Sequence, residues 1–316
     1  MEAVKTLTLK SGTSIPSILL PTFQIFTPGH TANKSSILAT PRVTHTYGPH
    51  PRQTLDLYLP PSSPSPNSTL HSSDPSPILI FLHGGGLTHG SKLSPEHPLV
   101  YHSTGSFFAQ RGVTTIIPDY RRVGVEGEDA AYPSGGEDVS LTLKWVVANL
   151  CQEGEREVVV MGNSAGGVHA STWAFDSLFL EERKGMSGGN LRVKGVVELA
   201  VPFDFAEGVE GAAVKYFGGK EGEKCAVGIV EALGREGVSR EEVAVPKVLV
   251  LLGEYEPEII EGPTGRFVEA WKRVWGEGLE FKVLKGHNHI SPPWALMAGE
   301  AEGEKWAEDL VEWIKN

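Results

Sequence analysis

The chain has little cysteine, no excess of positive charge and no long apolar run. Cys151 and Cys225 are the only cysteines among its 316 residues, which excludes a disulfide framework and a zinc site built on several cysteines. Lys and Arg number 28 against 39 Asp and Glu, so the formal net charge is −11. An acidic protein repels phosphate backbones, which argues against a general nucleic-acid-binding surface. We therefore expect two reduced thiols and no nucleic-acid partner.

The sequence also predicts neither a membrane-spanning nor a secretory segment. No stretch reaches the roughly 20 consecutive apolar residues that a membrane-spanning helix needs. The apolar run at residues 18–20 ends at Pro21, so it is far shorter than the core of a secretory signal. The expectation is a soluble, cytoplasmic protein with no membrane span.

The rest of the chain shows a regular alternation. Apolar residues make up 40% and charged residues 21%, close to ordinary globular usage. Short apolar runs typical of strands covered on both faces alternate with stretches of helical apolar spacing, which predicts a mostly parallel sheet flanked by helices. The predicted strands are 53–59, 78–82, 114–118, 158–161, 193–199, 248–252 and 279–283, and the predicted helices are 137–150, 164–178, 226–233, 262–275 and 303–315.

Two segments interrupt this alternation. Residues 60–77 are rich in Pro and Ser, and because a buried strand follows at once, we interpret them as a surface loop inside one domain. About 45 residues, from Pro202 to Lys247, separate two predicted strands, which is longer than an ordinary connection. We interpret them as an insertion over the carboxyl ends of the strands, where α/β sheets bind their ligands.

The strongest motif is the serine turn at residues 162–166, Gly-Asn-Ser-Ala-Gly. It follows a predicted strand and opens a predicted helix, which is the context of a nucleophile elbow. Gly162 and Gly166 leave room for the strand and helix backbones, and the helix N-terminus favours negative charge beside the serine. Ser164 is therefore the predicted nucleophile.

A second motif, His-Gly-Gly-Gly at residues 83–86, also follows a buried strand. Consecutive glycines let the backbone direct several N–H groups at one point, as a tetrahedral oxyanion requires. The N–H of Ala165, the residue after the serine, would complete such an oxyanion hole. We interpret His83 as a structural residue that orients the loop.

A serine nucleophile needs an acid that follows it in the chain. The segment 253–257, Gly-Glu-Tyr-Glu-Pro, comes directly after a predicted strand and offers two carboxylates. Glu256, which precedes Pro257 in the loop, is favoured over Glu254 as the residue that faces the base.

The base is predicted in the segment 286–291, Gly-His-Asn-His-Ile-Ser. His289, which the apolar Ile290 follows, is favoured over His287. A His-x-His pair can also chelate zinc, but the sequence has no H-E-x-x-H motif and no third cluster of ligands. No metal and no cofactor are therefore expected.

Together these motifs resemble those of the hormone-sensitive-lipase-like branch of the α/β-hydrolase superfamily. The resemblance covers about residues 50–316 and rests also on Asp119-Tyr120-Arg121, Tyr132-Pro133 and Glu137-Asp138. It implies one α/β-hydrolase domain over residues 1–316, with a helical cap formed by about 1–45 and the insertion about 203–245. It also implies that Gly85, Gly86 and Ala165 supply the oxyanion donors. The acid is Glu where the family usually has Asp, and the histidine segment reads HNHIS instead of ending in HGF, so Glu254 and His287 stay open.

The predicted reaction is two-step hydrolysis of a small-molecule carboxylic ester through Ser164, His289 and Glu256. One alternative is an amide or formamide hydrolase resembling kynurenine formamidases, although Leu87 stands where those carry a large aromatic residue. Others are a biosynthetic tailoring hydrolase for a natural-product ester or lactone, and a small-molecule receptor on the same fold. Four residues either line the substrate pocket or belong to the core, namely Leu87, Trp173, Phe203 and Phe205.

Overall fold

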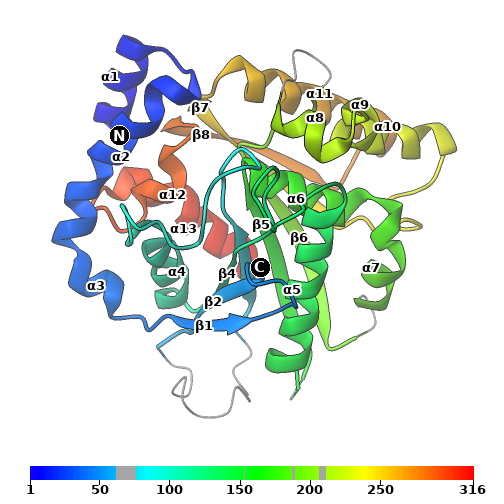
Figure 1. Ribbon diagram of the computed structural model, residues 1–316, viewed down its shortest axis with the longest axis horizontal. Coiled ribbons are helices and arrows are strands. Elements are labelled where there is room, and N and C mark those ends of the chain that lie inside the picture. Colours follow the sequence, from blue (N-terminus) through cyan, green and yellow to red (C-terminus); the bar gives the residue numbers. More distant parts are fainter. Residues whose placement is uncertain (62–75, 153, 187–188, 206–210) are drawn as a thin grey trace.

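The computed structural model describes residues 1–61, 76–152, 154–186, 189–205 and 211–316. Within them, one eight-stranded sheet lies between two layers of helices (Figure 1). Its strands, in the order in which they pair, are β1 (Val43–Thr46), β2 (Thr54–Tyr58), β4 (Thr114–Pro118), β3 (Ile78–Leu82), β5 (Arg156–Asn163), β6 (Leu191–Leu199), β7 (Lys247–Tyr255) and β8 (Leu279–Asn288).

Neighbouring strands from β4 to β8 pair in parallel, whereas β2 is antiparallel to both β1 and β4. The parallel strands bury both of their faces, which explains their continuous apolar runs. The helices are α1 (Glu2–Ser11), α2 (Ile15–Ala32), α3 (Lys34–Leu38), α4 (Val100–Gln110), α5 (Ser134–Leu150), α6 (Ala165–Phe175), η1 (Ser177–Phe179), α7 (Leu180–Met186), α8 (Ala212–Phe217), α9 (Glu221–Lys224), α10 (Ala226–Glu236), α11 (Glu258–Val274), α12 (Ser291–Ala295) and α13 (Ala301–Lys315).

Alternate side chains of the strands enter two separate cores. Ile78 and Ile80 of β3 belong to the core beneath α5, α6 and α11, whereas Leu79 and Phe81 point into the core beneath α4 and α13. The predicted mostly parallel sheet flanked by helices is therefore present. The two cysteines are buried, free and on different elements, with Cys151 after α5 and Cys225 before α10.

The predicted strands and helices are all present and differ mainly in their ends, whereas β1 and the helices α1 to α4, α7 to α9 and α12 were not predicted as elements. The predicted helix 164–178 stops at Phe175, because the Asp176 side chain accepts the N–H of Leu178 and starts the short helix η1. Strands β7 and β8 continue to Tyr255 and Asn288, beyond the predicted ends, because they resume pairing after an irregularity between Gly253 and Tyr255. The extensions carry the alternative residues Glu254 and His287, and the favoured residues Glu256 and His289 follow directly after the two strands.

Helix α1 and the insertion helices α8, α9 and α10 lie toward the carboxyl ends of the parallel strands, whereas α2 leads from there to α3, which packs on α4 (Figure 1). The N-terminal segment of the expected cap folds into α1, α2 and α3. Its helical part ends before the expected boundary at residue 45, because residues 43–45 belong to β1, which pairs with β2. The described part of the insertion folds into α8, α9 and α10, and α10 packs against α6 and α11. Most of the Pro/Ser tract, residues 62–75, lies outside the described residues. In the described part of the chain, no helix is long and apolar enough to cross a membrane.

The close approach of α4 to β2 gives a test of this packing. A Cβ atom added at Gly105 of α4 would lie 2.4 Å from the buried ring of Tyr58, whereas one added at Gly265 of α11 would meet nothing within 4 Å. Gly105→Ala should therefore lower the free energy of unfolding by about 1–3 kcal/mol. The matched control Gly265→Ala should raise it by up to about 1 kcal/mol, because alanine favours the helix. Urea unfolding measures both, and a Gly105→Ala variant as stable as the native protein would contradict the packing.

Candidate active site

Ser164 occupies a strained turn between β5 and α6. Its backbone has φ 52° and ψ −118°, a combination that non-glycine residues rarely adopt. The neighbouring glycines make the turn possible. A Cβ atom at Gly162 would lie 2.3 Å from Gly167 Cα, and one at Gly166 would lie 2.3 Å from the carbonyl oxygen of Leu82. The strand and helix backbones therefore touch, and the turn has the predicted strand–turn–helix form.

One line of hydrogen bonds joins Ser164, His289 and Glu256. His289 Nε2 lies 3.0 Å from Ser164 Oγ, and His289 Nδ1 lies 2.7 Å from Glu256 Oε2. An ionised carboxylate can only accept, so Nδ1 carries the hydrogen and Nε2 is left to accept the serine proton. The other oxygen of Glu256 accepts the N–H of Gly253 at 3.2 Å. The His289 and Glu256 side chains are only 3% and 1% exposed, so water does not compete for this bond.

The two alternative residues face elsewhere. Glu254 accepts the N–H of Gly286 at 2.7 Å, and that bond lowers the pKa of the Glu254 carboxyl. His287 Nδ1 bonds to Ser291 Oγ at 2.9 Å, and burial lowers the pKa of His287 to about 3. The structure therefore brings Glu256 and His289 to Ser164, and leaves Glu254 and His287 away from it. No group of three or more His, Cys, Asp or Glu side chains in the described ranges could hold a metal ion.

The glycine loop passes directly beside the serine. A Cβ atom at Gly84 would lie 3.5 Å from Ser164 Cβ. Gly85 and Gly86 have φ 148° and 60°, and among the described residues nothing accepts their N–H groups. Ala165 is the first residue of α6, where an N–H has no partner within the helix. Among the described residues these three backbone N–H groups are thus without an acceptor, and Gly86 and Ala165 line the same cavity as Ser164.

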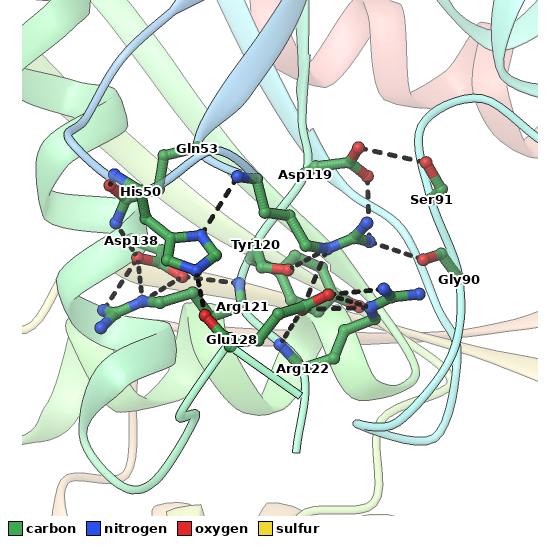
Figure 2. A network of polar contacts seen from close by, with 12 residues as sticks. His50, Gln53, Gly90, Ser91, Asp119, Tyr120, Arg121, Arg122, Glu128 and Asp138 are labelled. Atoms are coloured by element: carbon green, nitrogen blue, oxygen red, sulfur yellow. Dashed lines mark hydrogen bonds and ion pairs between the residues drawn. The ribbon is translucent and has the colours of Figure 1, made fainter. Parts of the chain in front are cut away.

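A polar network around Asp119 and Glu128 (Figure 2) reaches the glycine loop through His83. The Asp119 carboxylate accepts hydrogen bonds from His83 Nε2 at 3.0 Å and from Arg52 Nη2 at 3.2 Å. Arg52 also donates to the carbonyl oxygens of Gly90 at 2.6 Å and Tyr120 at 2.7 Å. Burial alone would raise the pKa of Asp119, but the bond from His83 and the charge of Arg52 hold it below its usual value. His83 has the structural place that we expected, whereas Arg52 was not anticipated from the sequence.

The other residues on which the family resemblance rests also have structural contacts (Figure 2). The backbone N–H of Arg121 donates to Asp138 at 2.8 Å, and its guanidinium bonds Asp138 at 3.0 Å and Glu137 at 2.9 Å. Gln53 Nε2 donates to the same Asp138 carboxylate at 2.7 Å. These bonds join the start of α5 to the segment after β4, and so fix the position of the polar network relative to the sheet.

A cavity of about 350 Å³ opens beside Ser164, within the range of small-molecule sites. Its walls are largely apolar and include Leu87, Val168, Phe205, Ala213, Ile259 and Pro263. Ile15 of α2 and Ala213 of α8 place both expected cap segments at this cavity. Of the four residues left open between pocket and core, Leu87 and Phe205 line the cavity. Phe203 stacks on Phe267 at 4.1 Å and Trp173 donates to Glu182 at 2.9 Å, so these two belong to the core.

Comparison with known proteins gives a consistent result. The BD-FAE family model matches residues 55–229, more than half of the chain. Carboxylesterase 3B of Mus musculus is 31% identical over 135 residues, which are 40% of this chain and 20% of that protein. "Probable carboxylesterase 13" of Arabidopsis thaliana is 26% identical over 272 residues, 77% of this chain and 78% of that protein. The chain spans only 20% and 32% of the first two curated relatives that it matches.

Solved structures resemble the whole chain. Esterase B from Lactobacillus rhamnosis has a TM-score of 0.62 at 17% identity, covering 100% of this chain and 96% of its own. The carboxylesterase EstE1 from a metagenomic library has a TM-score of 0.60 at 16% identity, covering 93% of this chain and 96% of its own. The predicted α/β-hydrolase fold and the predicted esterase-family resemblance are thus confirmed.

One buried carboxyl near the site was not anticipated. Glu198 of β6 is fully buried, and its Oε1 accepts the hydroxyl of Ser171 of α6 at 2.8 Å. Its Oε2 has no hydrogen-bond partner within the described ranges. This oxygen lies close to the α6 backbone, because a Cβ atom added at Gly167 would be only 2.7 Å from it. Burial raises the pKa of Glu198 well above its usual range, and the bond from Ser171 opposes this only in part. A buried carboxyl with a raised pKa therefore lies beneath α6, the helix that follows Ser164.

The raised pKa of Glu198 predicts a pH dependence of stability. Because the folded state holds the proton of Glu198 more tightly, this carboxyl adds to the free energy of unfolding. The added free energy is fully present below the unfolded-state pKa of about 4.3. It is lost at up to about 1.4 kcal/mol per pH unit as the pH rises toward the folded-state pKa. Glu198→Gln cannot ionise, so its free energy of unfolding should increase relative to the native protein between pH 5 and pH 8. The exposed control Glu269→Gln should follow the native curve. Urea unfolding at three pH values tests this, and parallel curves for the native protein and Glu198→Gln would rule it out.

Proposed function

The chain belongs to the BD-FAE family of α/β-hydrolase esterases, and we propose on this basis that it hydrolyses carboxylic esters of small molecules. The observation that carries the proposal is the hydrogen-bonded line from Glu256 through His289 to Ser164, at 2.7 and 3.0 Å, beside an apolar cavity. The carboxylesterase names of the relatives support the same class of reaction.

In the first step, His289 Nε2 takes the proton of Ser164 as Oγ attacks the ester carbonyl carbon. The carbonyl oxygen becomes an oxyanion, which the N–H groups of Gly85, Gly86 and Ala165 would stabilise. Each such donor can lower the barrier by roughly 3–4 kcal/mol. His289 then gives its proton to the leaving alkoxide, so that the alcohol departs and the acyl group stays on Ser164.

In the second step, water replaces the alcohol. His289 takes a proton from the water molecule as it attacks the acyl carbon, and returns a proton to Ser164 Oγ as the acid leaves. Glu256 keeps the imidazole in the tautomer with hydrogen on Nδ1 and stabilises the imidazolium that forms in each step. Its burial makes this interaction stronger than it would be in water. All protons in this scheme move between side chains, substrate and water.

We also propose that the chain is one hydrolase domain with a cap. The N-terminal helices α1 to α3 and the insertion would form this cap over the cavity. Support comes from Ile15 of α2 and Ala213 of α8, which line the cavity from the two segments. The apolar walls favour an apolar acyl or alcohol group, since each buried methylene gains about 0.8 kcal/mol.

Replacing the nucleophile tests the proposal. Ser164→Ala removes the attacking oxygen, so turnover of p-nitrophenyl butyrate should fall by about 10³-fold or more. A fluorophosphonate probe should label the native protein and fail to label Ser164→Ala. The exposed control Ser177→Ala should keep native turnover and labelling.

The same assay separates the alternative reactions. The native protein should cleave the butyrate ester faster than a lactone or an N-formyl amide of similar size. Full activity in Ser164→Ala would overturn the mechanism, a preference for the N-formyl substrate would favour a formamidase, and a native protein that the probe leaves unlabelled would favour a receptor.

The two glutamates give a matched pair of variants. Glu256→Gln would place an amide against His289 Nδ1 and favour the wrong tautomer, so kcat should fall by about 10³- to 10⁴-fold. Glu254→Gln should stay within about threefold of the native kcat, because Glu254 faces Gly286. Steady-state kinetics on the butyrate ester measure both. The reverse ranking would assign the acid to Glu254.

A further inference from the structure

Helix α2 contacts the histidine segment 286–291 through residues that are not among the proposed catalytic ones. Asn288 Nδ2 donates a hydrogen bond to Thr22 Oγ1 at 2.9 Å, across 266 residues of chain. Both side chains are fully buried, each at 0% exposure. Since water cannot replace this bond, its loss would leave the Asn288 donor without a partner in the protein interior.

Asn288 is also the residue that shapes the turn bearing His289. Its Oδ1 accepts the N–H groups of Ile290 and Ser291, each at 3.0 Å. Its own backbone N–H donates to Ser291 Oγ at 3.0 Å. One planar amide thus bonds the His289 turn through its oxygen and Thr22 through its nitrogen. The orientation that Thr22 gives to the amide therefore fixes the turn.

Further contacts bind the following residues to the same helix. Phe23 of α2 stacks on Trp294 of α12 with ring centroids 3.8 Å apart, and the His97 ring meets both edge-on at 5.0 Å. His30 Nε2 lies 3.1 Å from the carbonyl oxygen of Leu296. Helix α2 thus follows the chain from Asn288 to Leu296, and the His289 turn lies at the start of this docked segment.

We propose that α2 is a clamp for His289, in which Thr22 is a positioning residue that acts through Asn288. The proposal rests on the ester hydrolysis proposed above. His289 has to hold its Nε2 at Ser164 Oγ while its Nδ1 stays on Glu256, and a misplacement of about 1 Å can lower a rate by about 10²-fold. The helix that contributes Ile15 to the cavity therefore also sets the position of the base.

Variants of Thr22 test the clamp. Thr22→Val removes the hydroxyl at nearly constant volume, whereas Thr22→Ser keeps it. With p-nitrophenyl butyrate, Thr22→Val should lower kcat by about 10- to 100-fold with KM within about twofold, and Thr22→Ser should restore most of the native kcat. The rate of fluorophosphonate labelling should fall together with kcat, because labelling uses the same base. Thr27→Val is the matched control, since among the described residues the Thr27 hydroxyl bonds to Phe23 of its own helix and to no other residue, and it should keep native kinetics.

The outcomes separate the two proposals. A native protein without esterase activity overturns the proposed function, whereas an active native protein with native kcat in folded Thr22→Val overturns the clamp. A fall in activity that only follows the unfolded fraction, measured by circular dichroism at the assay temperature, also overturns it. Should Thr22→Val not fold, Phe23→Leu decides. A kcat lowered several-fold at unchanged KM supports the clamp, and a native kcat overturns it.

Discussion

The backbone turn at Ser164 is the constraint on which the site depends. A serine at φ 52° can stand between a strand and a helix only where both backbones approach closely, and Gly162 and Gly166 permit that approach. The turn exposes Oγ to His289 and places the N–H of Ala165 in the first turn of α6, where it has no partner within the helix. The remaining parts of the site are positioned relative to this turn, because a parallel sheet gathers the ends of distant strands at one edge.

Polar contacts behind the site hold each of these parts. The glycine loop after β3 is tied through His83 and Arg52 to the Asp119 carboxylate. The histidine turn after β8 bonds to Glu256 on one side and, through Asn288, to Thr22 of α2 on the other. The apolar cores on the two faces of the sheet supply rigidity, and these directed bonds supply the geometry that the proposed proton transfers need.

The sequence predicts the local parts of this arrangement and misses the parts that depend on tertiary pairing. Glycine spacing is enough to predict the Ser164 turn, because the requirement for small residues is local. The loop position before Pro257 is enough to favour Glu256 over Glu254, and the structure places Glu256 Oε2 2.7 Å from His289 Nδ1. The irregularity in the pairing of β7 with β8 between Gly253 and Tyr255, in contrast, shows in no pattern within either strand. Helix α2 was missed because Pro21 and Pro28 stand within it and are typical helix breakers. The bond from Asn288 to Thr22 joins residues too distant in the chain for any motif to indicate.

In the proposed reaction, Ser164 carries the acyl group between the two steps. Intact-protein mass spectrometry after rapid acid quenching of the native protein with p-nitrophenyl butyrate, followed by peptide mapping, would detect this acyl group directly. We expect a mass increase of one butyryl group during turnover, located on the peptide that contains Ser164. Turnover without any covalent adduct, or a butyryl group on a different residue, would contradict the proposed reaction.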